Sequence, residues 1–362
     1  MKLLRPIFLE VLSADIDHKI KLMTRFFVYC LLLFNVCISA TAASRTILTT
    51  REIIIDTDVG IDDVIAIVYL LKQPDINVKA ITIEGDGNAH CKPAFENIQS
   101  LLKLLRHPTI PIACGRSTPL SGTHHFPAAI LQTEDTLAGT PLIKSTAPFS
   151  SFSAEMLLVK TLRSASPTLD IVALGPLTSI AEVLNKHPEL KNKIRMIYEM
   201  GGAIHVSGNI TSIVPKSTNH RAEWNIYIDP YAAEKVFHSG VPITLIPLDV
   251  TDQVHIDESI YKAFKQRPLT PAAQLIYQLL IHNHQMIIDK TWFFWDPMAA
   301  VIASNEEIAT IKTLPLSVSL QPESTSGATI IDKQYGAPIR VCTAIDSKRF
   351  KNRLLQGIQQ SL

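Results

Sequence analysis

The sequence predicts an α/β fold: one domain with a mainly parallel open sheet, helices on both of its faces and an antiparallel extension at one edge. Apolar strand-like runs alternate with helical patterns over residues 53–248, and such alternation indicates βαβ units. From Leu314 to Ala344 the pattern changes to short alternating segments, which are typical of antiparallel strands. No linker or repeat divides the chain, so we expect a single domain over residues 44–362.

Residues 1–43 have the composition of a secretory signal. The apolar stretch from Phe26 to Ile38 follows basic residues and leads to Ala40-Thr41-Ala42, a small-x-small cleavage pattern. Met23 is an alternative start. An uncleaved anchor is the competing interpretation, because the stretch to Ala43 is barely long enough to span a bilayer. We expect cleavage, a periplasmic or secreted protein, and no stable membrane association afterwards.

The first predicted elements follow the expected alternation. The run Ile53-Ile54-Ile55 is fully apolar, which is typical of a strand buried inside a parallel sheet. Helix 93–105 carries apolar residues at a spacing of three and four. In order, we expect strand 53–56, a helix through Val64 and Leu71, strand 78–83, helix 93–105, a short strand near Ile112, a polar loop over 116–150 and a helix through Met156 and Leu162.

The second half continues in the same way. The strand over 169–174 ends at the tight turn Gly175-Pro176, and Pro297 is well placed to open a helix. In order, we expect strand 169–174, a helix through Ile180 and Leu184, strand 194–200, an irregular loop over 207–221, helix 231–237, strand 243–248, the helix from Pro297, the antiparallel segments and a last helix through Phe350 and Leu355.

Composition indicates a globular protein that acts on a small molecule. The chain is 47% hydrophobic and carries a net charge of +1, so it has no positive field that would gather nucleic acid. Beyond the signal, three cysteines remain, Cys91, Cys114 and Cys342. An odd number permits at most one internal bridge, and their spacing does not suggest a zinc site.

Four carboxylates directly follow the first strand: Asp56, Asp58, Asp62 and Asp63. Like charges this close destabilise a fold unless a cation or bound hydroxyl groups hold them. One acid would suffice as a helix cap, so capping does not explain four. Gly60 is expected to allow a tight turn between the two acidic pairs. Because ligands bind at the carboxyl ends of strands in open α/β sheets, the cluster predicts a metal site there.

Other strand and loop ends also carry polar groups. The turn after residue 174 would leave the Leu174 carbonyl free, and Glu223 and Asn225 would face one site if they alternate along a strand. Each alone has a structural alternative, as a turn residue or a helix cap. Carboxylates, carbonyls and amides favour calcium or magnesium over zinc. The candidates are Glu84, Asp86, Asn88, Leu174, Asn209, Glu223, Asn225 and Asp296.

At these residues the chain resembles the nucleoside hydrolase family, the inosine and uridine ribohydrolases. The resemblance extends from about Arg51 to the C-terminus, and its most specific motif, Asp-Thr-Asp-x-Gly-x-Asp-Asp, is complete over residues 56–63. Supporting blocks lie at 87–88, 173–178, 201–203, 222–226 and 295–297. The resemblance implies the nucleoside hydrolase fold, a small-molecule nucleoside substrate and hydrolysis of its N-glycosidic bond to free base and ribose.

The resemblance also implies roles for individual residues. One Ca²⁺ would be held by Asp58, Asp63, the Leu174 carbonyl and Asp296. Asp58 would also be the general base, and Asp56 would support the site without binding the metal. The ribose hydroxyl groups would be held by Asp62, Asn88, Asn209, Glu223 and Asn225. A homo-oligomer, dimeric or tetrameric, is left open.

The chain departs from the family pattern at the base-binding end. Members that accept inosine and uridine carry a His directly before the last Asp ligand, as proton donor to the base. Trp295 stands at that position here, as in members that prefer purines, where it stacks on the base. The resemblance therefore favours purine nucleosides. Candidates for a substitute acid, none of them favoured, are His220, His282 and His284.

Two loops also differ from the pattern. The loop over 123–139 lacks the His-Gly motif often found there, although it contains His124 and His125. An insertion between Asn209 and Glu223 makes Asn219 a rival for the role of Asn209.

Two other functions remain as alternatives. A haloacid-dehalogenase-type phosphatase also begins with an apolar strand and Asp-x-Asp, but Gly60 and the second acidic pair do not fit its motif. An exported nucleoside or ribose binding protein without catalysis would explain the altered base-binding end.

Overall fold

The computed structural model describes residues 22–26, 50–142 and 149–360. Most of the predicted signal segment therefore lies outside the described residues, and residues 22–26 form a short exposed helical segment. The remaining described residues belong to a compact unit that spans Thr50–Leu362. No helix among the described residues is long and apolar enough to cross a membrane.

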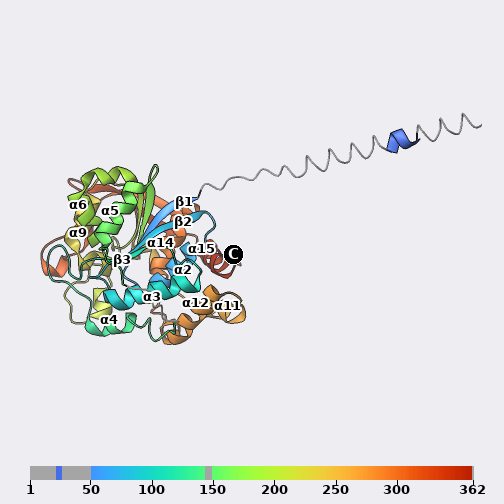
Figure 1. The fold of residues 1–362 in the computed structure, drawn as a ribbon. Coiled ribbons are helices and arrows are strands. Elements are labelled where there is room, and N and C mark those ends of the chain that lie inside the picture. Colours follow the sequence, from blue (N-terminus) through green and yellow to red (C-terminus); the bar gives the residue numbers. More distant parts are fainter. Residues whose placement is uncertain (1–21, 27–49, 143–148, 361–362) are drawn as a thin grey trace, which may run out of the picture. The chain divides into compact units, whose positions relative to one another are not determined.

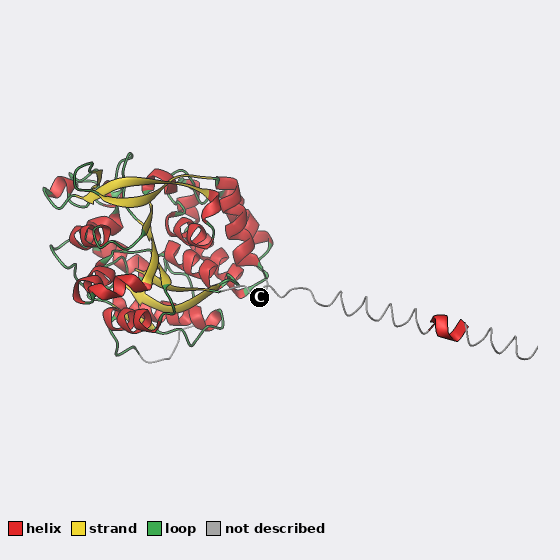
Figure 2. Cartoon of the chain, turned by 90° about the horizontal axis from the view of Figure 1, so that it is seen from above, coloured by secondary structure: helices red, strands yellow, loops and turns green. Residues whose placement is uncertain are grey.

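A nine-stranded sheet runs through this unit (Figures 1 and 2), in the order β3-β2-β1-β4-β5-β6-β9-β7-β8. All pairings from β3 to β9 are parallel, and only β7 runs antiparallel to its two neighbours. The predicted mainly parallel sheet with an antiparallel edge is confirmed. The strands are β1 (Arg51–Thr57), β2 (Ile76–Ile83), β3 (Ile112–Cys114), β4 (Leu169–Ala173), β5 (Ile194–Met200), β6 (Ile243–Ile246), β7 (Ala309–Val318), β8 (Thr329–Ile331) and β9 (Ala337–Ile345).

Helices cover both faces of the sheet, as predicted, because the strands present apolar side chains alternately to the two sides. On β1, Ile53 and Ile55 belong to one buried cluster, whereas Ile54 belongs to the other. The first cluster packs against α2 (Ile61–Leu71), α3 (Cys91–Leu104), α11 (Glu258–Gln266), α12 (Pro271–His282), α14 (Trp295–Ser304) and α15 (Ser347–Gln359). The second packs against α5 (Ala154–Ser164), α6 (Thr178–Lys186) and α9 (Pro230–Phe237) (Figure 1).

The strand order reverses direction between β1 and β4. From β1 the chain first builds β2 and β3 on one side, and then β4, β5 and β6 on the other. Connections leave the carboxyl ends of β1 and β4 in opposite directions, so a crevice forms between them, which is where open α/β sheets bind ligands. The acidic residues that follow β1 therefore lie beside this crevice.

The predicted strand at Glu223 and Asn225 is wrong. These residues begin α8 (Trp224–Ile228), and Glu223 is its N-cap, accepting hydrogen bonds from the backbone N–H groups of Asn225 and Ile226. A carboxylate that satisfies the free N–H groups of a first turn favours helix at that point. The two side chains therefore do not share a strand face.

Several short helices were not predicted. The loops expected over 116–150 and 207–221 contain α4 (Ala128–Glu134) and α7 (Ile210–Ile213), and the segment between β6 and α14 contains four helices. The signals for two of these were present: Asp257 and Thr270 are side-chain N-caps, and Pro271 opens α12. The others in this segment are α10 (Leu248–Thr251) and α13 (His284–Ile288).

One disulfide joins Cys91 at the start of α3 to Cys114 at the end of β3, with a Cα to Cα distance of 5.9 Å. Cys342 is free and buried. The limit of one bridge is thus confirmed. The bridge lies under the loop that follows β2, because a Cβ atom added to Gly85 would meet the Cys91 sulfur at 3.0 Å. The disulfide therefore links the start of α3 to the end of β3 next to the loop that follows β2.

We expect the double substitution Cys91→Ser with Cys114→Ser to lower the free energy of unfolding by about 3 kcal/mol, because the bridge closes a loop in the unfolded chain. The closed loop has a sequence separation of 23. Urea unfolding with and without a thiol reductant measures this. Reductant should destabilise the wild-type protein and leave the double variant unchanged; a wild-type protein insensitive to reductant would contradict the expectation.

Candidate functional site

Asp58 lies at the centre of the crevice, directly after β1, and is 2% exposed. Two glycines, Gly87 after β2 and Gly175 after β4, pack closely against its side chain. A Cβ atom on Gly87 would lie 2.0 Å from the Asp58 Cβ, and one on Gly175 would lie 3.0 Å from the same atom. The Asp58 Oδ2 also accepts the backbone N–H of Asn88 at 3.0 Å. The carboxylate is thus fixed by the loops that follow β1, β2 and β4.

The turn after Asp58 differs in detail from the expectation. Val59, and not Gly60, adopts the left-handed conformation, with φ of 63°, although such a φ is strained for a β-branched residue. Gly60 has an extended backbone and serves as N-cap of α2. A glycine is required at this position because there is no room for a side chain: a Cβ atom would lie 2.8 Å from the Asn88 Nδ2.

Four acids converge at this point, and we call them the carboxylate cluster: Asp58, Asp62, Asp63 and Asp296. Carboxylate oxygens of Asp62, Asp63 and Asp296 lie within 4.8 Å of one another. Asp63 also contacts Asp58 and accepts hydrogen bonds from the Gly60 N–H at 2.8 Å and from the Thr57 hydroxyl. Asp296 comes from the first turn of α14, far away in sequence.

Burial and mutual repulsion raise the pKa values throughout the cluster. Burial raises the pKa of Asp58 well above its usual range, and the charges of Asp63 and Asp62 add to the increase. The pKa of Asp296 rises well above its usual range for the same reasons, burial first and then Asp62 and Asp63. Burial followed by the Asp63 charge raises the pKa of Asp62 to about 7. Such a cluster is stabilised when a cation neutralises it.

The donor set fits a hard divalent cation. Every converging group offers oxygen, as calcium and magnesium require. The Asn88 Oδ1 is buried and has no hydrogen-bond partner among the described residues, and buried polar atoms are seldom left unpaired. Asn88 therefore has an oxygen available for a ligand beside the cluster, in keeping with its predicted role.

The Leu174 carbonyl, predicted as a metal ligand, is not free. It accepts a hydrogen bond from the Asn225 Nδ2 at 3.1 Å, and the same amide donates to the Met200 carbonyl at 3.0 Å. A carbonyl oxygen has two lone pairs, so one remains for a cation. Asn225 thus braces the carbonyl, and its predicted contact with ribose would have to use Oδ1.

The side chains of Glu223, Asn209 and Asn219 differ in how many of their polar atoms already form hydrogen bonds. The Glu223 carboxylate accepts backbone N–H groups of Gly202, Asn225 and Ile226. Both ends of the Asn219 side chain bond to backbone groups, from Arg221 and Ala222 on one side and to residues 323 and 326 on the other. Asn209 accepts one bond, from the Trp224 N–H. Asn219 is therefore a loop brace, and Asn209 is the better candidate for a ligand.

Three further buried acids, Asp56, Glu84 and Asp86, hold the segments around the carboxylate cluster in place through hydrogen bonds. Asp56 is fully buried and accepts the Thr82 hydroxyl, as expected of a supporting residue. Glu84 accepts the backbone N–H of Ser179 at 3.0 Å and its hydroxyl at 2.9 Å. Asp86 accepts the Thr178 hydroxyl at 2.7 Å. Glu84 and Asp86 thereby fasten the loop after β2 to the N-terminus of α6.

Two acids near the site were not singled out from the sequence. The Glu134 Oε2 accepts the Ile61 N–H at 3.0 Å, and burial followed by the Asp62 charge raises its pKa to about 8. Asp252 accepts the Trp295 Nε1–H at 3.0 Å. Both lie in segments without a recognised motif, so only their tertiary contacts identify them. Trp295 directly precedes Asp296 at the start of α14, and its ring packs against the main buried cluster.

The histidines considered as acids are mostly engaged elsewhere. The His124 ring bonds to the Tyr227 carbonyl and to Glu323 at 3.0 Å. The His284 Nε2 contacts Glu258 at 2.7 Å. His125, His220 and His282 are exposed.

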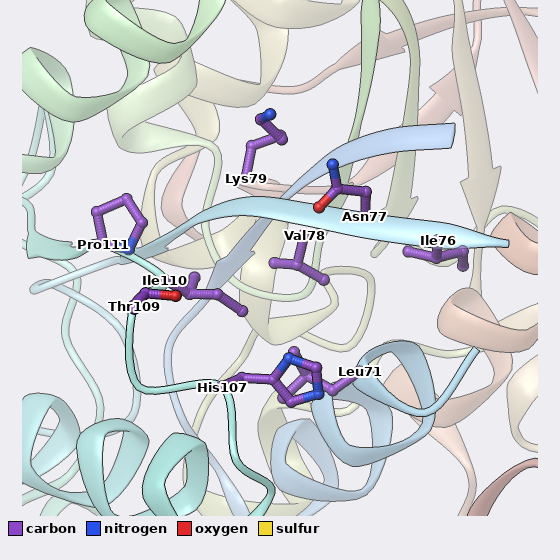
Figure 3. A pocket seen from close by; sticks show the side chains of 9 residues that line it. All are labelled: Leu71, Ile76, Asn77, Val78, Lys79, His107, Thr109, Ile110 and Pro111. Atoms are coloured by element: carbon purple, nitrogen blue, oxygen red, sulfur yellow. The ribbon is translucent and has the colours of Figure 1, made fainter. Parts of the chain in front are cut away.

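A separate cavity of about 260 Å³ (Figure 3) lies at the amino-terminal end of β2. Its lining includes Ile76, Val78 and His107. It is therefore at the opposite end of the strand from the carboxylate cluster and takes no part in the site.

Comparison with known proteins agrees with this geometry. Residues 53–352 match the family described as inosine-uridine preferring nucleoside hydrolase. The chain is 36% identical over 288 residues to the pyrimidine-specific ribonucleoside hydrolase RihA of Salmonella paratyphi B, covering 78% of this chain and 89% of that protein. Two solved structures are similar at 26% identity: a plant nucleoside hydrolase (TM-score 0.77, 86% of this chain, 99% of that chain) and a purine-preferring ribonucleoside hydrolase from Gardnerella vaginalis (TM-score 0.74, 85% and 98%).

We expect Gly87→Ala to displace Asp58, because the new methyl group would overlap the Asp58 Cβ. Overpacking of this kind costs about 1–3 kcal/mol of unfolding free energy, and calorimetry should show at least about tenfold weaker binding of a divalent cation. Gly122→Ala is the control: its φ of +89° makes it strained too, but no atom lies within 4 Å. Unchanged affinity for the cation in Gly87→Ala would contradict the expectation.

In the presence of a chelator, we expect Asp296→Asn to be more stable than the wild-type protein at pH 8. The folded-state pKa of Asp296 is raised, so the folded chain binds its proton more tightly than the unfolded chain, and wild-type stability falls as pH rises above the unfolded pKa. The difference should exceed about 1 kcal/mol at pH 8 and shrink towards pH 5. Urea unfolding at both pH values measures it; a difference independent of pH would contradict the expectation.

Proposed function

The chain belongs to the inosine-uridine preferring nucleoside hydrolase family, and we propose that it hydrolyses the N-glycosidic bond of ribonucleosides, with Ca²⁺ as cofactor, to free base and ribose. Its relatives are named ribonucleoside hydrolases, and the chain is accordingly a nucleoside hydrolase. The observation that carries the proposal is the buried carboxylate cluster in the crevice between β1 and β4, where three carboxylates approach within 4.8 Å. The identity of the metal ion as calcium and the choice of ribonucleosides as substrates are proposals.

Calcium suits the cluster because the donors are oxygens from separate segments of the chain. Asp58 follows β1, Asp63 lies in the first turn of α2, Leu174 follows β4, and Asp296 lies in the first turn of α14. An irregular set of this kind matches the variable coordination of calcium better than the strict octahedron of magnesium. When bound, the ion would neutralise the acids, attract the ribose hydroxyl groups and lower the pKa of a coordinated water.

Asp58 is the proposed general base. Its carboxylate is held on both sides by glycines and by the Asn88 N–H, so its position relative to a bound sugar would vary little. A base must lie within hydrogen-bond reach of the proton that it removes. Asp58 would take the proton of the water that attacks the anomeric carbon of the ribose.

The surrounding acids would stabilise the transition state. Breaking an N-glycosidic bond builds positive charge on the ribose, and negative groups fixed in place stabilise that charge more than they stabilise the neutral substrate. Asp62, Asn88, Asn209, Glu223 and Asn225 are the proposed ribose contacts. Three of them, Asn209, Glu223 and Asn225, have few degrees of freedom, because hydrogen bonds with backbone groups already orient their side chains.

We propose a preference for purine nucleosides on the basis of Trp295. Its indole is partly exposed, and the Nε1–H is bound to Asp252 at 3.0 Å, which fixes the ring plane. A fixed indole offers more stacking area to a bicyclic base than to a single ring. RihA of Salmonella paratyphi B is named as pyrimidine-specific, so base preference is the property that most needs measurement.

Export to the periplasm or medium remains a proposal. The signal-like residues 1–43 support it, and so does the disulfide between Cys91 and Cys114, because disulfides persist mainly in oxidising compartments. A homo-oligomer also remains a proposal.

We expect chromatography to detect free base released from inosine, adenosine and guanosine with kcat/KM at least about tenfold higher than from uridine and cytidine, a difference of about 1.4 kcal/mol. A calcium chelator should abolish turnover, and Asp58→Asn should reduce kcat by about 10²- to 10⁴-fold, the usual contribution of a general base.

Asp332→Asn is the matched control, because Asp332 is an acid in the turn between β8 and β9. Turnover that survives both the chelator and Asp58→Asn would refute the proposed mechanism. Nucleoside binding without base release would favour the non-catalytic binding protein. Turnover confined to pyrimidines would refute only the argument from Trp295.

A further inference from the structure

Three rings stand in a row beside the carboxylate cluster, and we call them the aromatic wall: His255, Phe293 and Trp295. The centroids of His255 and Phe293 are 4.3 Å apart, and those of Phe293 and Trp295 are 5.4 Å apart. His255 and Phe293 are paired across an antiparallel bridge. Trp295 is followed directly by Asp296, so the chain joins one end of the wall to the carboxylate cluster.

The wall lies at the edge of the core, and each of its three rings is partly exposed. Trp292 and Phe294 are at most 1% exposed and belong to the main buried cluster, whereas Phe293 and Trp295 between and after them are partly exposed. Two backbone hydrogen bonds, from Ile256 to Trp292 and from Phe294 to Val254, flank the pair formed by His255 and Phe293. Extended segments direct alternate side chains to opposite sides, which places His255 and Phe293 on the open side. Trp295, the first residue of α14, is partly exposed and also packs against the main buried cluster.

His255 is a proton carrier without a protein partner. Its Nδ1 is buried and unpaired, and neither ring nitrogen forms a hydrogen bond with the described residues. Asp252 is close enough to interact with it electrostatically. This distinguishes it from His124 and His284, which are bonded to Glu323 and Glu258. Because Nδ1 is buried, Nε2 is the nitrogen that can meet a ligand.

We propose that the aromatic wall binds the nucleobase and that His255 Nε2–H donates the proton that the departing base requires. The proposal rests on the function proposed above and identifies the general acid that the proposed reaction still lacks. A ribose held at the carboxylate cluster would place its attached base against Trp295, the first ring of the wall. The base would stack along Trp295 and Phe293, and its far edge would then reach towards His255. Asp252 would fix the indole through its hydrogen bond with the Trp295 Nε1–H.

The proton transfers balance. The C1′–N bond breaks with its electron pair left on the base, and His255 Nε2 gives a proton to a ring nitrogen of that base, N7 in a purine. The oxygen of water bonds to C1′, and Asp58 takes the proton of that water. His255 regains a proton from solvent as Asp58 releases one, so the sum is nucleoside plus water to base plus ribose.

The test compares two leaving groups in His255→Gln, which keeps a hydrogen-bond donor but has no proton to transfer. With inosine, kcat should fall by about 10²- to 10³-fold, as expected for loss of a general acid. With p-nitrophenyl riboside, whose phenolate departs without a proton, kcat should change by less than about threefold. Calorimetry with an inert C-nucleoside, 9-deazainosine, should give a Kd within about fivefold of the wild-type value, because the wall still binds the base.

His284→Gln is the control, since His284 is bound to Glu258 outside the wall; both of its activities should equal those of the wild-type protein. Equal losses with inosine and p-nitrophenyl riboside in His255→Gln would assign His255 a structural role and overturn the inference. Undiminished inosine turnover would overturn it as well. A wild-type protein that cleaves neither substrate would instead refute the proposed function.

Discussion

The site depends on one electrostatic constraint: several carboxylates are withdrawn from water at the carboxyl ends of adjacent parallel strands. Burial raises the pKa values of Asp58 and Asp296 well above their usual range, so without a cation the ionised cluster opposes folding. The surrounding structure reduces this opposition. Backbone N–H groups of Gly60 and Asn88 point at the acids, and deeper acids are bound to the N-terminus of α6. The fold and the proposed cofactor are therefore energetically linked.

Much of this arrangement was predictable from the sequence, because its signals are local. The apolar run Ile53-Ile54-Ile55 predicts a buried parallel strand, and the motif over 56–63 places acids at its end. Since parallel strands bring their carboxyl ends to one edge, polar residues after β2 and β4 could be assigned to the same site. The supporting role of Asp56 was implied by the resemblance to the nucleoside hydrolases, and this residue is fully buried.

The remainder depends on contacts between distant segments. Nothing local distinguishes Asn209 from Asn219; only the bonds of Asn219 to residues 323 and 326 identify it as a brace. Glu223 lay in a segment with strand-like alternation, but its carboxylate caps α8 instead. Glu134 and His255 lie in segments without a recognised motif, and only tertiary contacts bring Glu134 to Ile61 and His255 to Phe293. Sequence patterns encode which side a residue faces, but not which remote residue it meets.

The two glycines around Asp58 leave the sugar end of the crevice no spare volume. A single added carbon at Gly87 or Gly175 would approach the Asp58 Cβ to 2.0 or 3.0 Å. Variation is therefore permitted mainly where the packing is open, on the partly exposed rings that follow Asp252. Substitutions at these rings can therefore alter the base preference without disturbing the packing around Asp58.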